Sequence, residues 1–188
     1  MGALFSSASG QVLAFLLLLL LASVFLTSRY VAYARKKNIL DIPNDRSSHH
    51  TPTPRGGGVV FVALFLLVVF VFFFYYPAER PLWVALLGGG SVVVLVGWLD
   101  DRRNLSARFR LSAHFFSMAF ALACLGGYAS LSWGHWIIPL GFWGVPLALV
   151  GGVWCINLFN FMDGIDGLAA SESALVALGA ASILLKNQ

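Results

Sequence analysis

Cysteine is scarce in this chain of 188 residues, which contains only Cys124 and Cys155, both inside apolar runs. A disulfide framework is therefore excluded, and ordinary packing explains both thiols. Charge is also scarce, because Asp, Glu, Lys and Arg together supply 11% of the residues. So few charged side chains exclude the surface of a water-soluble domain. The sequence also lacks a linker between domains, a low-complexity tail and a fixed-period repeat.

Apolar residues are abundant, at 59% of the chain, and the mean hydropathy is +0.84. A helix needs roughly 20 residues to cross about 30 Å of hydrocarbon. Six runs approach that length: Val12–Ala32, Val59–Tyr76, Leu82–Leu99, Leu111–Tyr128, Ile137–Leu158 and Leu168–Leu185. Backbone groups in lipid must be bonded within a segment, and alternating strand patterns are not evident, so these runs predict helices. We expect an all-α polytopic membrane helix bundle, with residues 1–188 in a single transmembrane domain.

Basic residues gather in two connections and predict the orientation of the helices. The connection after the first run holds Arg29, Arg35, Lys36, Lys37, Arg46 and Arg55, and the one after the third holds Arg102, Arg103, Arg108 and Arg110. Basic connections favour the cytoplasm, so we expect the N-terminus outside and cytoplasmic loops at about 33–58, 100–110 and 159–167. The net charge of +4 would attract anionic lipid headgroups or phosphorylated substrates, although the basic residues could serve topology alone.

The first predicted loop reads DIPNDRSSHHTPTPRGGG, where three prolines and three glycines exclude a regular helix. Glycine amides can approach a phosphate closely, and Arg46 and Arg55 offer planar forks that match its oxygens. Alternatively, the run 56–58 allows the next helix to pack closely. The adjacent pair His49 and His50 lacks the spacing of recurrent metal ligands.

The second predicted loop reads GWLDDRRNLSARFRL and places Asp100 beside Asp101 at the end of the third helix. Two adjacent carboxylates repel each other, and a bound cation would relieve that repulsion. Acidic residues contribute little to membrane topology, so orientation does not explain them. The alternative is a solvated helix end paired with Arg102 and Arg103.

The third predicted loop contains NFMDGIDG after the fifth run. Asn157 and Asn160 are one turn apart on the predicted helix, and Asp163 and Asp166 have the same separation. Glycines between and after the aspartates suit a turn into a helix N-terminus, whose amides would bind phosphate. Carboxylate and carboxamide oxygens suit Mg²⁺, which commonly joins protein carboxylates to substrate phosphates. A helix cap would explain one aspartate but leaves the other three residues unexplained. The three loops together predict phosphoryl transfer at the cytoplasmic membrane surface.

The motifs DIPNDRSSHHTPTPRGGG, LDDRRNLSARFRL and NLFNFMDGIDGLA resemble those of the polyprenyl-phosphate N-acetylhexosamine-1-phosphate transferases, in glycosyltransferase family 4. Phospho-N-acetylmuramoyl-pentapeptide transferase is in the same superfamily and is the alternative branch, although PRGGG favours the amino-sugar branch. The resemblance runs from about Asp41 to Ala170. It implies an enzyme of the bacterial inner membrane that initiates O-antigen-type polysaccharide synthesis.

The implied reaction transfers a sugar-1-phosphate from a UDP-N-acetyl amino sugar to undecaprenyl phosphate and releases UMP, with Mg²⁺ or Mn²⁺ as cofactor. The implied partners are these two substrates and membrane lipids, with no nucleic acid; a homodimer is a further possible assembly. By the family pattern, Asp100, Asp101 and Asp163 would be catalytic and hold the metal, and one of the adjacent pair would act as base. The implied substrate-binding residues are Arg46, Thr53, Arg55, Asn157, Asn160, Gly164, Ile165 and Asp166.

The chain departs from the family pattern in length. Family members have further membrane helices and a later loop containing histidine, so we expect this sequence to be an N-terminal portion. Two non-enzymatic alternatives are a transporter or channel fragment and a lipid-binding or assembly protein. A transporter would place its acidic residues near the middle of a membrane helix, whereas these lie at predicted helix ends.

Overall fold

The protein is described by a computed structural model that covers residues 8–41, 51–103, 105–133, 136–162 and 167–186. These residues form two compact units. The first unit contains the described residues up to Gly126, and the second contains those from Gly127 onward.

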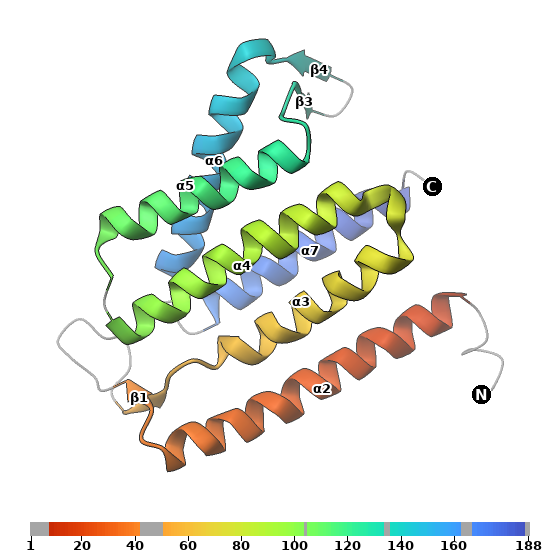
Figure 1. Cartoon of the computed structure of the whole chain (residues 1–188). Helices are drawn as coiled ribbons and strands as arrows, with labels where there is room; N and C mark the ends of the chain where they lie inside the picture. Colours follow the sequence, from red (N-terminus) through yellow and green to blue (C-terminus); the bar gives the residue numbers. More distant parts are fainter. Residues whose placement is uncertain (1–7, 42–50, 104, 134–135, 163–166, 187–188) are drawn as a thin grey trace. The chain divides into compact units, whose positions relative to one another are not determined.

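The first unit contains four α-helices (Figure 1). They are α2 (Ala8–Lys36), α3 (Gly58–Tyr75), α4 (Arg80–Arg103) and α5 (Ala107–Cys124). Helices adjacent in the chain pack against each other, and the α4–α5 pair is the most extensive. Between α2 and α3, β1 (Leu40–Asp41) pairs antiparallel with β2 (Thr53–Pro54). The 3-10 turn η1 (Pro77–Glu79) reverses the chain between α3 and α4.

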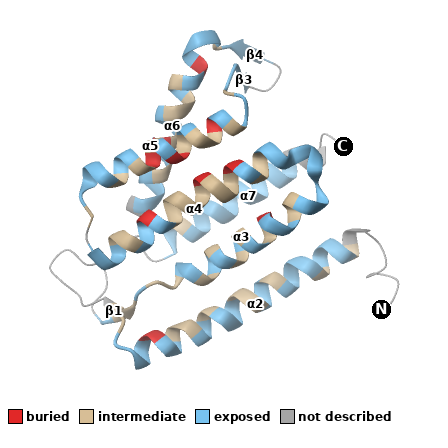
Figure 2. Cartoon of the chain, viewed as in Figure 1, coloured by how far each residue is buried: buried red, intermediate tan, exposed pale blue. Residues whose placement is uncertain are grey.

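Few residues of the first unit are buried, and exposed and intermediate residues prevail along its helices (Figure 2). Its buried apolar residues are Ala34, Val69, Ala85, Val96 and Leu122. Large apolar side chains remain exposed along α2 and α3, including Leu21 at 68% and Phe61 at 65%. Exposing so much apolar surface to water would cost roughly 25 cal/mol per Å², so these helices require a lipid environment.

Small residues let α4 and α5 approach closely. The Ser117 hydroxyl of α5 donates a buried hydrogen bond of 2.7 Å to the Gly89 carbonyl of α4. A Cβ atom at Gly89 would lie 3.0 Å from the Ser117 carbonyl oxygen, so the glycine leaves just enough room for the partner helix. Close approach through small residues and a hydroxyl bond is typical of helix pairs in membranes.

The second unit contains a hairpin and two helices. Its elements are β3 (Ser130–Trp133), β4 (Trp136–Pro139), the 3-10 turn η2 (Gly141–Trp143), α6 (Gly144–Met162) and α7 (Leu168–Lys186). The strands pair antiparallel, with Ser130 opposite Pro139 and Trp133 opposite Trp136. A Cβ atom at Gly144 would lie 1.7 Å from the Tyr128 carbonyl oxygen, so no other residue fits where α6 begins.

The prediction of six helices is confirmed by the six α-helices of the described residues. Two short antiparallel strand pairs also occur in the connections between the helices. The predicted fifth helix also began too early, since Ile137 lies in β4 and α6 begins at Gly144. The physical reason is Pro139, which lacks an N–H, followed by Gly141 at φ +51°, a conformation that the interior of an α-helix cannot contain.

Four segments within the described residues are long and apolar enough to cross a membrane: Gly10–Lys36, Gly58–Tyr75, Pro77–Arg103 and Gly141–Asn160. The predicted number of six crossings is therefore supported only in part. Helix α5 carries Arg108 and Arg110 in its first turns, which lowers its hydropathy. Helix α7 has 19 residues, and the apolar segment found among its described side chains is Leu168–Ser182.

Candidate active site

The acidic pair lies in the last turn of α4, where Asp100 and Asp101 precede Arg103. Successive residues on a helix point about 100° apart, so the two side chains meet different surroundings. The Asp100 side chain is 20% exposed and turns toward α5, whereas Asp101 is an exposed residue. The pair therefore provides one partly buried carboxylate and one exposed carboxylate.

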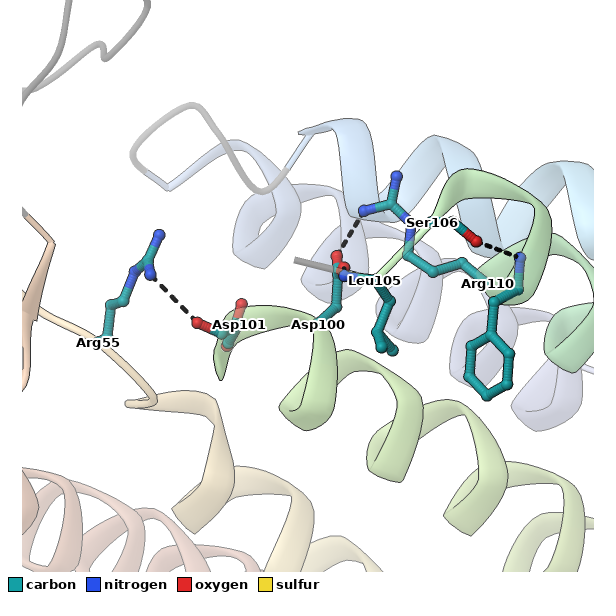
Figure 3. Close-up of polar contacts among 7 residues, drawn as sticks. Arg55, Asp100, Asp101, Leu105, Ser106 and Arg110 are labelled. Carbon is teal, nitrogen blue, oxygen red and sulfur yellow. Dashed lines mark hydrogen bonds and ion pairs between the residues drawn. The ribbon is translucent and has the colours of Figure 1, made fainter. Parts of the chain in front are cut away.

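Asp100 joins the end of α4 to the start of α5 (Figure 3). Its Oδ1 atom accepts a hydrogen bond of 2.8 Å from the Leu105 amide, and its Oδ2 atom forms an ion pair with the Arg110 guanidinium. Ser106 caps α5 by accepting a hydrogen bond of 3.3 Å from the Phe109 amide. A carboxylate with these two donors holds the connection in one conformation. From the sequence, Arg102 and Arg103 were the alternative partners of the acidic pair. The structure instead shows Arg110 of α5 as the ion-pair partner of Asp100.

Arg55 reaches the same end of α4 from the connection before α3. Its Nη1 atom donates a hydrogen bond of 3.1 Å to the Asp101 backbone carbonyl, 46 positions later (Figure 3). That carbonyl belongs to the last turn of α4, where a cation also interacts favourably with the helix dipole. This contact brings together parts of the first two predicted loops, as the sequence led us to expect.

Tyr30, which the sequence did not single out, lies beside Arg55. Its hydroxyl donates a hydrogen bond of 3.1 Å to the Arg55 carbonyl, 25 positions later. Tyr30 falls among the basic residues at the end of α2 that were explained by topology. Tyr30 belongs to no recognisable motif in the sequence, so its contact with Arg55 is evident only from the fold.

The remaining residues of the first loop are placed in part. Thr53 lies in β2, pairs with Asp41 in β1 and is half-buried. Arg46 lies outside the described residues, as do the two histidines. Thr53 therefore lies in β2, two residues before Arg55. A role for Arg46 stays a prediction.

The asparagines of the third loop lie on α6, in the second unit. Asn157 donates a hydrogen bond of 2.8 Å from Nδ2 to the Val153 carbonyl one turn earlier, and Asn160 is exposed. The described chain resumes at Gly167, which has φ +77° and precedes α7, so the predicted turn into a helix is confirmed at this residue. The other predicted residues of this loop lie outside the described part: Asp163, Gly164, Ile165 and Asp166.

The described residues contain no cluster of three or more His, Cys, Asp or Glu side chains that could hold a metal ion. Two adjacent carboxylates are nevertheless compatible with Mg²⁺, which is commonly bound by one or two protein carboxylates together with substrate phosphates. Asp101 is exposed to solvent, and the oxygens of Asp100 accept N–H donors from Leu105 and Arg110. The third predicted ligand, Asp163, lies outside the described residues.

Comparison with known proteins identifies the family of the chain. The sequence profile of glycosyl transferase family 4 matches residues 83–188, which include the acidic pair and the NFMDGIDG segment. The chain belongs to this family. The matched region starts near the beginning of α4 and continues through α7. Arg55 and Tyr30 precede it, so the contacts of Arg55 with Asp101 and of Tyr30 with Arg55 are results of the structure.

Family 4 relatives carry names that specify a reaction. The chain is 33% identical over 157 residues to an undecaprenyl-phosphate alpha-N-acetylglucosaminyl 1-phosphate transferase of Yersinia pestis, covering 81% of this chain and 41% of the relative. It is 32% identical over 181 residues to a decaprenyl-phosphate N-acetylglucosaminephosphotransferase of Mycobacterium leprae, covering 84% and 44% respectively. A transferase of Escherichia coli K12 with the same name as the Yersinia protein is 33% identical over 165 residues, covering 82% and 43%. The chain therefore spans about two fifths of the length of these relatives.

Proposed function

We propose that this protein transfers an N-acetylhexosamine-1-phosphate from a UDP-sugar to undecaprenyl phosphate and releases UMP. The observation that carries the proposal is the contact between Arg55 and the Asp101 carbonyl, which brings a cation to the turn of α4 that carries the two aspartates. Phosphoryl transfer depends mainly on positioning and on neutralising charge, and this arrangement offers groups for both. Membership of glycosyl transferase family 4 and the names of the relatives support the same reaction.

The proposed reaction forms one bond and breaks one. An oxygen of the lipid phosphate attacks the β-phosphorus of the UDP-sugar, and the bond from that phosphorus to the bridging oxygen breaks, so UMP leaves with the electron pair. Arg55, together with Arg46, would bind phosphate oxygens and orient the diphosphate. Thr53, Asn157, Asn160 and the segment 164–166 would line the substrate pocket.

Asp100, Asp101 and Asp163 would hold a Mg²⁺ or Mn²⁺ ion, with Asp101 as the exposed member of the adjacent pair. The bound ion would neutralise the charge that develops on the leaving UMP. The contacts of Asp100 give it a second task, since its carboxylate also holds the α4–α5 connection and thereby orients Asp101.

The proposed location is the bacterial inner membrane, with six crossing helices in one transmembrane domain, the N-terminus outside and the site at the cytoplasmic surface. Undecaprenyl phosphate keeps its chain in the bilayer while the nucleotide sugar is dissolved in water, so their reaction needs a site at this boundary. Both aspartates lie in the last turn of α4, which disfavours an ion path through the middle of the helix.

The test follows UMP release in membranes containing the protein, supplied with undecaprenyl phosphate, Mg²⁺ and UDP-N-acetylglucosamine or UDP-N-acetylmuramoyl-pentapeptide. We expect release with the amino sugar and a loss of about 100-fold or more in Asp101→Asn. The matched control is Glu79→Gln, because Glu79 precedes the opposite end of α4. Wild-type turnover by Asp101→Asn would remove this residue from the mechanism, and release only with the pentapeptide substrate would assign the protein to the alternative branch.

A further inference from the structure

Both peptide groups of Arg55 are held by residues that precede it in the chain. Its amide donates a hydrogen bond of 3.1 Å to the Ile39 carbonyl, which extends the pairing of β1 with β2. Its carbonyl accepts the hydrogen bond from the half-buried Tyr30. Because the amide and the carbonyl of Arg55 are both hydrogen-bonded, its backbone orientation is fixed. The side chain therefore points toward the end of α4, where it reaches the Asp101 carbonyl.

Gly56 has no side chain, and this leaves room for the Tyr30 side chain. A Cβ atom at Gly56 would lie 2.4 Å from the Tyr30 hydroxyl oxygen and 3.3 Å from Cζ. The backbone of Gly56 also has φ +83°, which favours glycine independently of the space. By contrast, a Cβ atom at Gly57 or Gly58 would meet nothing within 4 Å. Of the three glycines, only Gly56 is therefore in a close contact, and its neighbour is the Tyr30 side chain of α2.

The contact is not explained by the packing of α2 against α3 along the membrane. It lies at the polar end of the two helices, between a tyrosine hydroxyl and a main-chain carbonyl. Many tyrosines near a membrane boundary serve as interfacial anchors, but an anchor does not require a glycine in the left-handed region opposite its hydroxyl. The neighbouring Tyr33, one turn later on α2, is 52% exposed and provides the comparison.

We propose that Tyr30 is a positioning residue for Arg55: its hydroxyl, fitted against Gly56, fixes the Arg55 backbone so that the guanidinium is presented beside Asp101 to the diphosphate of the nucleotide sugar. This inference rests on the proposed function for the identity of the ligand. Tyr30 itself touches no substrate. A guanidinium carries five N–H donors in a fixed fork, so it can bond the Asp101 carbonyl and phosphate oxygens together.

The kinetic test compares Tyr30→Phe, which removes only the hydroxyl, with the control Tyr33→Phe. We expect Tyr30→Phe to raise KM for the UDP-sugar about three- to tenfold, as loss of one neutral hydrogen bond predicts, with little change in the melting temperature. In an Arg55→Ala background the same substitution should have no further effect, because the group that it positions is gone. Equal losses in both backgrounds, or an unchanged KM, would overturn the inference.

A second measurement does not depend on activity. Amide hydrogen exchange over residues 55–58 should become about two- to tenfold faster in Tyr30→Phe and stay unchanged in Tyr33→Phe. Unchanged exchange in Tyr30→Phe would overturn the positioning contact even if the enzyme is active. Faster exchange in a protein that releases no UMP from any tested substrate would overturn the proposed function and leave the contact between Tyr30 and Arg55 standing.

Discussion

Arg110 of α5 forms an ion pair with Asp100 of α4, ten positions earlier, across the connection between the two helices. The same carboxylate accepts the Leu105 amide, so it secures the connection at two points. The adjacent Asp101 is left on the surface at the end of α4. Two residues that look equivalent in the sequence therefore have different surroundings in the fold, and substitution should distinguish them.

We expect Asp100→Asn to lower the free energy of unfolding by about 1 kcal/mol, because the amide keeps an acceptor for Leu105 but loses the charge that holds Arg110. Asp101→Asn should lower the free energy of unfolding less than Asp100→Asn does, because Asp101 is exposed and water screens the interactions of an exposed carboxylate. Thermal unfolding in detergent measures both variants. Arg110→Gln provides the control: combined with Asp100→Asn, it should cost less than the sum of the two single changes. A fully additive double variant would show that the ion pair contributes nothing.

The glycines of α4 offer a second contrast, between two neighbouring positions with opposite surroundings. Gly89→Ala should lower the free energy of unfolding by about 1–3 kcal/mol, because the new methyl would lie 3.0 Å from the Ser117 carbonyl oxygen and push α5 away. Gly90→Ala is the matched control, since a Cβ atom there meets nothing within 4 Å. Alanine favours helix over glycine by up to about 1 kcal/mol, so this variant should be neutral or more stable. Equal destabilisation by both would contradict the close approach of α4 and α5 at Gly89.

The predicted orientation can be checked by cysteine labelling at opposite ends of α3. In a background with Cys124→Ala and Cys155→Ala, Thr51→Cys should react with an impermeant maleimide only after the cells are opened. Ala78→Cys should react in intact cells. Both positions are exposed, so access depends on the side of the membrane and not on burial. The reverse pattern would place the end of α4 that carries Asp101 outside the cell, where a soluble nucleotide sugar from the cytoplasm could not reach it.

The sequence by itself determined the class of this protein and the residue types of its site. Long apolar runs cannot be satisfied in water, which predicts membrane helices whatever their partners. The three polar motifs, with their aspartates, asparagines and glycines, indicate phosphoryl transfer through their chemistry and their order in the chain. Hydropathy did not predict where the fifth helix begins, because the apolar run continues across Pro139 and Gly141. These two residues delay the start of α6 through their backbone conformation.

Only the tertiary structure decided which side chains share a task. Asp100 is bonded by Leu105 and Arg110, and Arg55 meets the end of α4 across 46 positions. Tyr30 positions Arg55 through a hydrogen bond to the Arg55 main-chain carbonyl. The identities of the residues alone do not predict such a bond. The physical reason is that hydrophobicity and conformational preference act locally along the chain, whereas hydrogen bonds between distant segments depend on how the helices pack.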